Sequence, residues 1–211
     1  MEKERIPLHE KKIFPIIYMI LISTFFVAIL ASIYYGTSER VMNYKMNKER
    51  SQILDLFDIS YTDNNLAEVF SKSVQKKTKN DLIYWKILKN GKDVGFCFKI
   101  VGKGLWGTIT AFVATTTDIK KVIGIEFIAQ NETPGLGARI TEDKFKDQFK
   151  GKKLVSSDKI IRYNLVTEDN TSPEFSEIKQ ITGATASSNA VISMIYKNIK
   201  SISKKMGRDY E

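Results

Sequence analysis

The chain contains one long uncharged apolar run near its N-terminus, and the sequence after it mixes charged, polar and apolar residues. The segment Ile13 to Tyr35 contains 23 residues, none of them charged. A helix rises about 1.5 Å per residue, so this run would span roughly 35 Å, enough to cross a bilayer with some tilt. We therefore predict a transmembrane helix over 13–35, preceded by a short polar segment, residues 1–12. A cleavable signal peptide is the alternative, although its apolar region is usually only about 7–15 residues long.

The pattern that follows the span is charged and only loosely periodic. Glu39 to Asp58 is polar at its start and more apolar at its end, which predicts a stalk helix. Leu66 to Val74 predicts a second, short helix, and the lysine-rich segment 76–80 predicts a basic loop. We group residues 36–80 as a stalk and helical connector.

From Asp81 the residues favour strands. The dipeptide Asn90-Gly91 is a hairpin signal between two β-rich segments. Thr141 to Phe149 predicts a short helix with its two phenylalanines facing inward. The expected strands are 83–88, 94–101, 108–115, 122–129 and 160–166. This order predicts an α+β domain, residues 81–211, with a mainly antiparallel sheet.

A hydroxyl-rich turn leads into an amphipathic helix near the C-terminus. The apolar stripe of that helix falls at three- and four-residue intervals and comprises Val191, Ile192, Ile195, Ile199 and Ile202. Residues 181–189 read Ile-Thr-Gly-Ala-Thr-Ala-Ser-Ser-Asn. The start of a helix presents unpaired N–H groups and positive dipole charge, so this turn can bind an anion such as phosphate. The simpler interpretation is a Ser/Thr cap on a core helix.

The amino-acid composition limits which partners and cofactors we expect for this chain. The net charge is +9, which indicates a lysine-rich solvated surface with some attraction to anionic lipid. The charges are dispersed and no recognition motif accompanies them, so we expect no nucleic acid partner. His9 and Cys97 are the only residues of their kinds. Disulfides, haem attachment, iron–sulfur ligand sets and histidine-based metal sites are therefore not expected in the domain, and redox chemistry here needs an organic cofactor.

Three segments together resemble a known family. They are Gly102-Lys103-Gly104-Leu105-Trp106-Gly107, Glu132-Thr133-Pro134-Gly135-Leu136-Gly137, and Thr182-Gly183-Ala184-Thr185 with Ser187-Ser188. In this order, behind one span, they resemble the Gly-rich Trp segment, the Glu-Thr-Pro-Gly-Leu-Gly loop and the flavinylation motif of the FMN-binding domain. That family includes the proteins RnfG and NqrC and related membrane-anchored flavoproteins.

The resemblance implies a covalent flavin. The last threonine of the motif, Thr185, would carry FMN through a phosphoester bond made by a flavin transferase. Cofactor binding would also involve Thr182, Gly183, Ala184, Ser187, Ser188, the loop Glu132, Thr133, Pro134, Gly135, Leu136, Gly137, and Trp106. Trp106 could stack near the flavin ring or could simply belong to the core. No catalytic residue and no metal ligand is implied.

The resemblance further implies that the chain is an electron-transfer subunit of an ion-translocating ferredoxin:NAD oxidoreductase (Rnf) complex. Such a subunit would not be catalytic alone, and its partners would be other membrane subunits. The alternatives are an NqrC-like subunit of a sodium-translocating NADH:quinone oxidoreductase, a stand-alone anchored flavoprotein, and a non-redox tether.

The basic residues on the two sides of the span nearly balance, so charge does not orient it. The resemblance implies a cytoplasmic N-terminus and an extracytoplasmic domain on the cytoplasmic (inner) membrane.

Two positions depart from the family pattern. The motif usually has an acidic residue three positions before its first Thr or Ser, and here that residue is Lys179. The family often has a histidine two positions before the loop Glu132, where this chain has Gln130. The first departure concerns how a flavin transferase recognises the site.

Overall fold

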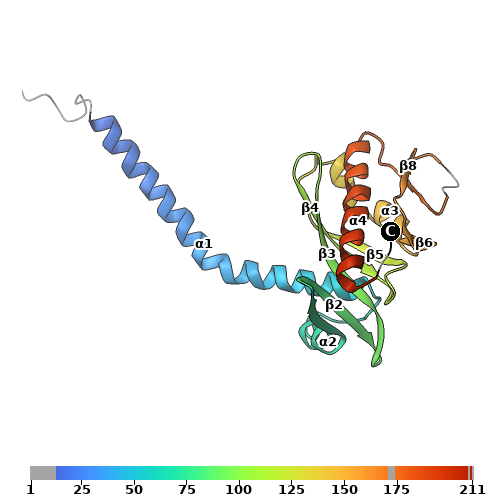
Figure 1. Ribbon diagram of the computed structural model, residues 1–211. Helices are drawn as coiled ribbons and strands as arrows, with labels where there is room; N and C mark the ends of the chain where they lie inside the picture. Colours follow the sequence, from blue (N-terminus) through green and yellow to red (C-terminus); the bar gives the residue numbers. More distant parts are fainter. Residues whose placement is uncertain (1–12, 171–173, 209, 211) are drawn as a thin grey trace, which may run out of the picture. The chain divides into compact units, whose positions relative to one another are not determined.

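The computed structural model describes residues 13–170, 174–208 and 210 of the 211-residue chain (Figure 1). The predicted N-terminal segment 1–12 and its His9 lie outside the described residues. The chain divides into two compact units, Met1–Met46 and Asn47–Glu211. The second unit therefore begins before residue 81, and the predicted boundary between connector and FMN-binding domain stays a prediction.

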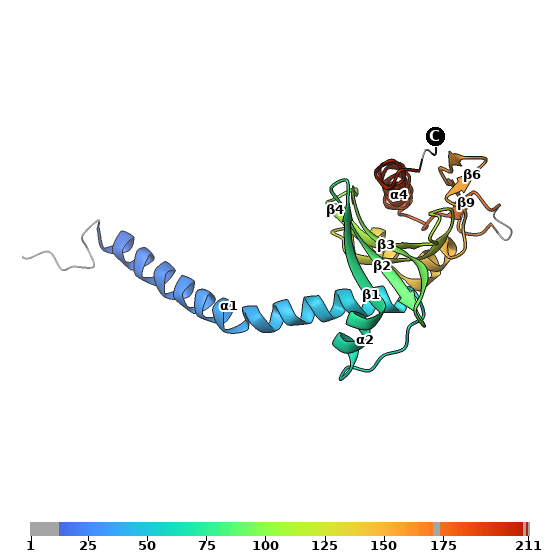
Figure 2. The same cartoon turned by 60° about the horizontal axis from the view of Figure 1, so that its bottom comes forward.

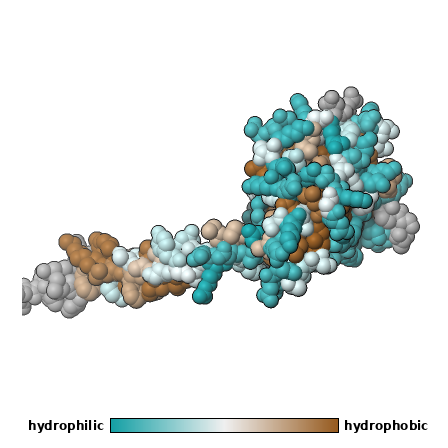
Figure 3. All heavy atoms as spheres, turned by 90° about the horizontal axis from the view of Figure 1, so that it is seen from below, coloured by the Kyte–Doolittle hydropathy of each residue, from teal (hydrophilic) through white to brown (hydrophobic). Residues whose placement is uncertain are grey.

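Helix α1 runs without interruption from Phe14 to Asp55. Its most apolar stretch is long enough to cross a bilayer, and none of that stretch is buried. Apolar side chains cover this part of the helix in Figure 3, whereas polar residues dominate the visible face of the second unit. By length and composition the helix can cross a membrane, as predicted for 13–35. The separately predicted stalk is the continuation of the same helix, because Gly36 does not interrupt it.

A five-stranded antiparallel sheet forms the centre of the second unit. Its order β1-β2-β3-β4-β5 follows the sequence, so each strand pairs with the one before it. The strands are β1 (Val74–Lys79), β2 (Leu82–Lys89), β3 (Lys92–Lys103), β4 (Thr108–Thr115) and β5 (Val122–Ala129). Asn90 and Gly91 both have positive φ, as a tight hairpin turn requires, and the predicted hairpin is confirmed. The predicted α+β fold with a mainly antiparallel sheet is likewise confirmed.

The prediction of a basic loop over 76–80 is wrong. These lysines belong to β1, which lies at one edge of the sheet with its last five residues exposed. Lysines are common on edge strands because they oppose pairing with another chain. The turn that follows, Asn80–Asp81, has positive φ at both residues and leads directly into β2.

Helices cover both faces of the sheet. Helix α4 (Thr185–Met206) lies on one face, while α2 (Leu66–Ser73) and the end of α1 lie on the other (Figures 1 and 2). Strand β4 shows the effect: Ala111 and Val113 join the core beneath α4, whereas Phe112 joins the core beneath α1 and α2. Because both faces are covered, β4 is buried along most of its length instead of alternating with solvent.

The segment between β5 and α4 is irregular. It contains η2 (Gly137–Thr141), α3 (Asp143–Lys146), η3 (Asp147–Phe149), β6 (Val155–Ser156), β7 (Lys159–Ile160), β8 (Asn164–Val166) and β9 (Glu177–Lys179). Phe145 and Phe149 are buried as predicted, with ring centroids 5.5 Å apart. The predicted single helix over 141–149 is instead a short helix and a 3-10 turn. The predicted strand 160–166 is divided between β7 and β8, which pair with different partners.

Candidate functional site

The flavinylation-like turn is held in one conformation by its own backbone. Gly183 has φ +78°, a region that favours glycine, and the Ala184 N–H donates a hydrogen bond to the Ile181 carbonyl at 2.9 Å. A Cβ on Gly183 would lie 3.1 Å from the side chain of Leu136, so the turn also sits against the Glu132–Gly137 loop. Two of the three predicted segments therefore meet here.

Ser187 and Ser188 are buried and bonded within the protein. The Ser188 hydroxyl accepts a hydrogen bond from the Ile181 N–H at 3.1 Å and donates to the Ala184 carbonyl at 3.1 Å, which fastens the turn to the first turn of α4. Ser187 donates to the carboxylate of Glu132. Both hydroxyls thus contribute to the structure of the turn, and their part in cofactor binding stays a prediction.

Glu132 connects all three segments. Its side chain is 5% exposed. One carboxylate oxygen accepts hydrogen bonds from the backbone N–H groups of Leu105 (2.9 Å) and Trp106 (3.2 Å), and the other accepts from Ser187. The Glu132 N–H in turn donates to the side chain of Gln130, the position at which the family often has histidine. A buried carboxylate needs such partners, and here they come from the β3–β4 loop and from α4.

The loop after Glu132 is compact. The Thr133 carbonyl accepts hydrogen bonds from the N–H groups of Leu136 and Ala138, both at 3.1 Å, and Gly135 has φ +75°. Gly137 packs so closely that a Cβ there would meet the Ser187 hydroxyl and the Glu132 side chain. Thr133, Pro134 and Gly135 are exposed, so the tip of the loop faces solvent.

Thr185 is the first residue of α4 and is exposed. No side chain caps the helix, and the first backbone bond into it is from the Ser188 N–H to the Ala184 carbonyl. Within the described residues, the N–H groups of Thr185, Ala186 and Ser187 have no acceptor. A 22-residue helix with an open N-terminus and an exposed hydroxyl at its first position suits a phosphate monoester. The residues present therefore fit FMN.

Three large apolar side chains are exposed on the loops that Glu132 joins. Trp106 is 70% exposed, Leu105 57% and Leu136 45%. The alternative that Trp106 belongs to the core is therefore wrong. Exposed apolar side chains on fixed loops are suited to contact a flat ring or a partner surface.

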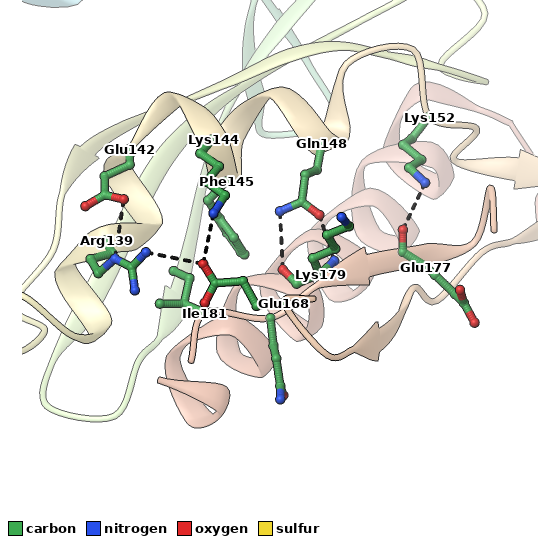
Figure 4. Close-up of a pocket in the computed structure, with 11 residues that line it drawn as sticks. Arg139, Glu142, Lys144, Phe145, Gln148, Lys152, Glu168, Glu177, Lys179 and Ile181 are labelled. Atoms are coloured by element: carbon green, nitrogen blue, oxygen red, sulfur yellow. Dashed lines mark hydrogen bonds and ion pairs between the residues drawn. The ribbon is translucent and has the colours of Figure 1, made fainter. Parts of the chain in front are cut away.

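A charged pocket of about 320 Å³ lies beside the turn (Figure 4). Its charged lining residues are Arg139, Lys144, Lys152, Lys179, Glu142, Glu168 and Glu177. Glu168 links this pocket to the turn, because its carboxylate accepts a hydrogen bond from the Thr182 N–H at 2.8 Å. Bonds from the Thr182 hydroxyl and N–H, and then from Lys144, lower the pKa of Glu168 to about 2. Sequence reasoning missed Glu168, because no local pattern marks it.

Comparisons with known proteins agree with this geometry. Residues 104–200 match the family model of the FMN-binding domain. The chain is 29% identical over 179 residues to the RnfG-type protein of the proton-translocating ferredoxin:NAD(+) oxidoreductase complex of Clostridium ljungdahlii, with 85% of each chain covered. It is 34% identical over 128 residues to the NqrC-type protein of the Na(+)-translocating NADH-quinone reductase of Vibrio campbellii, covering 59% of this chain and 48% of that protein. The chain thus spans about half the length of that relative.

Solved structures show the same fold. NqrC of Shewanella oneidensis superposes with a TM-score of 0.68 at 20% identity, covering 74% of this chain and 93% of that one. Its counterpart in the Na(+)-translocating NADH-quinone reductase of Parabacteroides distasonis gives 0.65 at 22% identity, covering 80% and 94%. The resemblance to the FMN-binding domain family that the three segments carry is thus confirmed.

Replacing Glu132 with alanine should loosen the connection between the segments. The Leu105 and Trp106 N–H groups and the Ser187 hydroxyl would lose their acceptor, which should lower the free energy of unfolding by about 1–3 kcal/mol. Urea unfolding followed by tryptophan fluorescence measures this. Thr133→Ala, at the exposed neighbouring position, serves as the control and should change stability by less than about 0.5 kcal/mol. Equal midpoints for the two variants would contradict the role assigned to Glu132.

Proposed function

We propose that this chain is an FMN-carrying electron-transfer subunit of a membrane-bound, ion-translocating ferredoxin:NAD oxidoreductase of the Rnf type. One observation supports this proposal above all. The three segments that resemble the family are joined through Glu132, and beside them the exposed Thr185 begins a helix whose N-terminus has no side-chain cap. The alignment with the Clostridium ljungdahlii protein, which includes 85% of both chains, supports the Rnf type over the shorter matches to the sodium-pumping reductase.

FMN is joined to this chain through its phosphate at the Thr185 hydroxyl oxygen. A flavin transferase would make the bond from a flavin dinucleotide: the hydroxyl oxygen bonds to the flavin-side phosphorus, the phosphoanhydride bond breaks, and a nucleoside monophosphate and the hydroxyl proton leave. The first N–H groups of α4 hold the phosphate and its charge is favoured by the helix dipole. When bound, FMN supplies the electron transfer, while the protein supplies position and environment. Trp106, Leu105 and Leu136 are exposed and would supply apolar surface for the ring.

Thr185→Ala should abolish covalent flavin, because it removes the acceptor oxygen. The variant should still fold, since even the loss of a helix cap costs only about 0.5–2 kcal/mol. Thr185→Ser should retain the modification and Thr182→Ala should weaken it without removing it. Mass spectrometry of the peptide containing Thr185, from protein coexpressed with a flavin transferase, measures each outcome. Flavin found on another residue would refute the assignment.

The chain also works within a complex and does not complete a turnover alone. We assign one organic cofactor site among the residues that the structure describes, and the sequence contains one histidine and one cysteine. Purified in mild detergent, it should bring other membrane subunits with it. Those subunits also decide the type of complex, since a quinone reductase assembly would favour the NqrC-like alternative. A single-chain species with full oxidoreductase activity would defeat this part of the proposal.

The domain lies on the extracytoplasmic side of the membrane. Lys92 is exposed, whereas Cys97 is fully buried and burial raises the pKa of its thiol. A Lys92→Cys variant should therefore react with a membrane-impermeant thiol reagent in intact cells that lack an outer membrane, while the parent chain should not. Reaction of Lys92→Cys only after lysis would reverse the orientation.

A further inference from the structure

The parallel pairing of β8 and β9 places Glu168 beside the flavin-attachment turn. Val166 pairs with Lys179, and the Gln180 N–H donates to the Val166 carbonyl at 2.9 Å. Just beyond the ends of the two strands, Glu168 reaches Thr182, the first residue of the motif. Its Oε2 accepts the Thr182 N–H at 2.8 Å. The contact thus joins positions 14 residues apart.

Two cations hold the same carboxylate from the other side. Lys144 Nζ lies 3.1 Å from Glu168 Oε1 and Arg139 Nη2 lies 3.4 Å from it. Figure 4 shows both basic side chains pointing toward Glu168 from the η2–α3 segment. One oxygen therefore orients the turn while the other is anchored to a different part of the domain. The Glu168 side chain is only 22% exposed, so this arrangement is partly shielded from water.

The charge on Glu168 persists under ordinary conditions. Its pKa is lowered to about 2, so the ionised form is favoured by folding. The stabilisation of the folded state by ionised Glu168 is fully present above the ordinary carboxyl pKa and is lost as the pH falls toward 2.

Lys179 occupies the position at which the motif that this turn resembles usually has an acidic residue. In this chain, the carboxylates near the motif belong to a different segment. The Lys179 backbone is bound on both sides by Gln148, through its N–H at 2.7 Å and its carbonyl at 3.2 Å. Lys179 lines the same pocket as Glu168, and the pKa of the neighbouring Asp169 is lowered first by the hydrogen bond from Thr167 and, to a smaller extent, by the charge of Lys179. The carboxylates beside the motif therefore come from the 168–169 segment, across the strand pair.

We propose that Glu168 is a positioning residue that takes the place of the motif's acidic residue: it fixes Thr182 and supplies the carboxylate beside the flavin-attachment turn, so that a flavin transferase accepts Thr185 despite Lys179. This inference rests on the proposed function. Ile181 is held by the Ala184 N–H and by the Ser188 hydroxyl, whereas the Thr182 N–H is held by Glu168.

The test compares initial rates of flavin attachment to the full-length chain by a limiting amount of flavin transferase, measured by flavin fluorescence and intact mass. Glu168→Gln preserves shape but removes the charge, and we expect the rate to fall by roughly tenfold or more, the factor expected for losing a charged hydrogen bond. Glu142→Gln is the matched control. Glu142 lines the same pocket and contacts Arg139 but has no hydrogen bond to the turn, so its rate should stay at that of the parent chain.

Rescue separates positioning from a general structural role. Adding Lys179→Asp to Glu168→Gln restores an acidic residue at the family position and should bring attachment back to within a few-fold of the parent rate. Hydrogen exchange of the Thr182 amide, measured without flavin, should be faster in Glu168→Gln and unchanged in Glu142→Gln. A parent-like rate for Glu168→Gln, or a loss that Lys179→Asp does not repair, would overturn the inference.

The same experiment distinguishes a failure of this inference from a failure of the proposed function on which it rests. A parent chain that takes up no flavin would overturn the proposed function and the inference together. A parent chain that is modified on Thr185, matched in rate by Glu168→Gln, would overturn only the role of Glu168.

Discussion

The arrangement of the site depends on one buried carboxylate. Glu132 accepts two backbone N–H groups of the Leu105–Trp106 segment and the hydroxyl of Ser187, and these partners come from a hairpin tip and from α4. A carboxylate buried without them would carry a large desolvation cost, so the two loops and the helix stabilise one another through Glu132. The exposed residues near Thr185 acquire fixed positions because this bonding lies beneath them.

The position of α4 is set by the sheet. A Cβ on Gly102 would collide with Met194, so the absence of a side chain on β3 lets the helix approach the strand closely. Val191, Ile195 and other apolar residues of α4 pack into the core on that face. Because the hairpin tip at Gly104–Gly107 extends β3 and β4, it and the start of α4 lie at the same end of the sheet, where the Glu132 carboxylate joins them.

Local patterns predict much of the fold and less of the site. The Asn90-Gly91 hairpin and the stripe on α4 each depend on a short stretch of sequence, and both are confirmed. The polar lysines of β1 predict a loop, yet an edge strand tolerates them, which is why that prediction fails. The family segments can be found from their residues alone, but the role of Glu168 cannot, since it follows from pairing between β8 and β9, which are only three residues each.

The contrast between buried and exposed groups at the site suits modification by another enzyme. A hydroxyl that must enter a transferase's active site has to be accessible in the folded chain, and Thr185 is exposed at the first turn of α4. The groups that fix the preceding turn and connect α4 to the loops, namely Ser187, Ser188 and Glu132, are all buried. Rigid support under an accessible acceptor lowers the entropy lost when the acceptor is aligned for reaction. The same division leaves the apolar side chains of Trp106 and Leu136 exposed, where a flat ring or a partner surface could contact them.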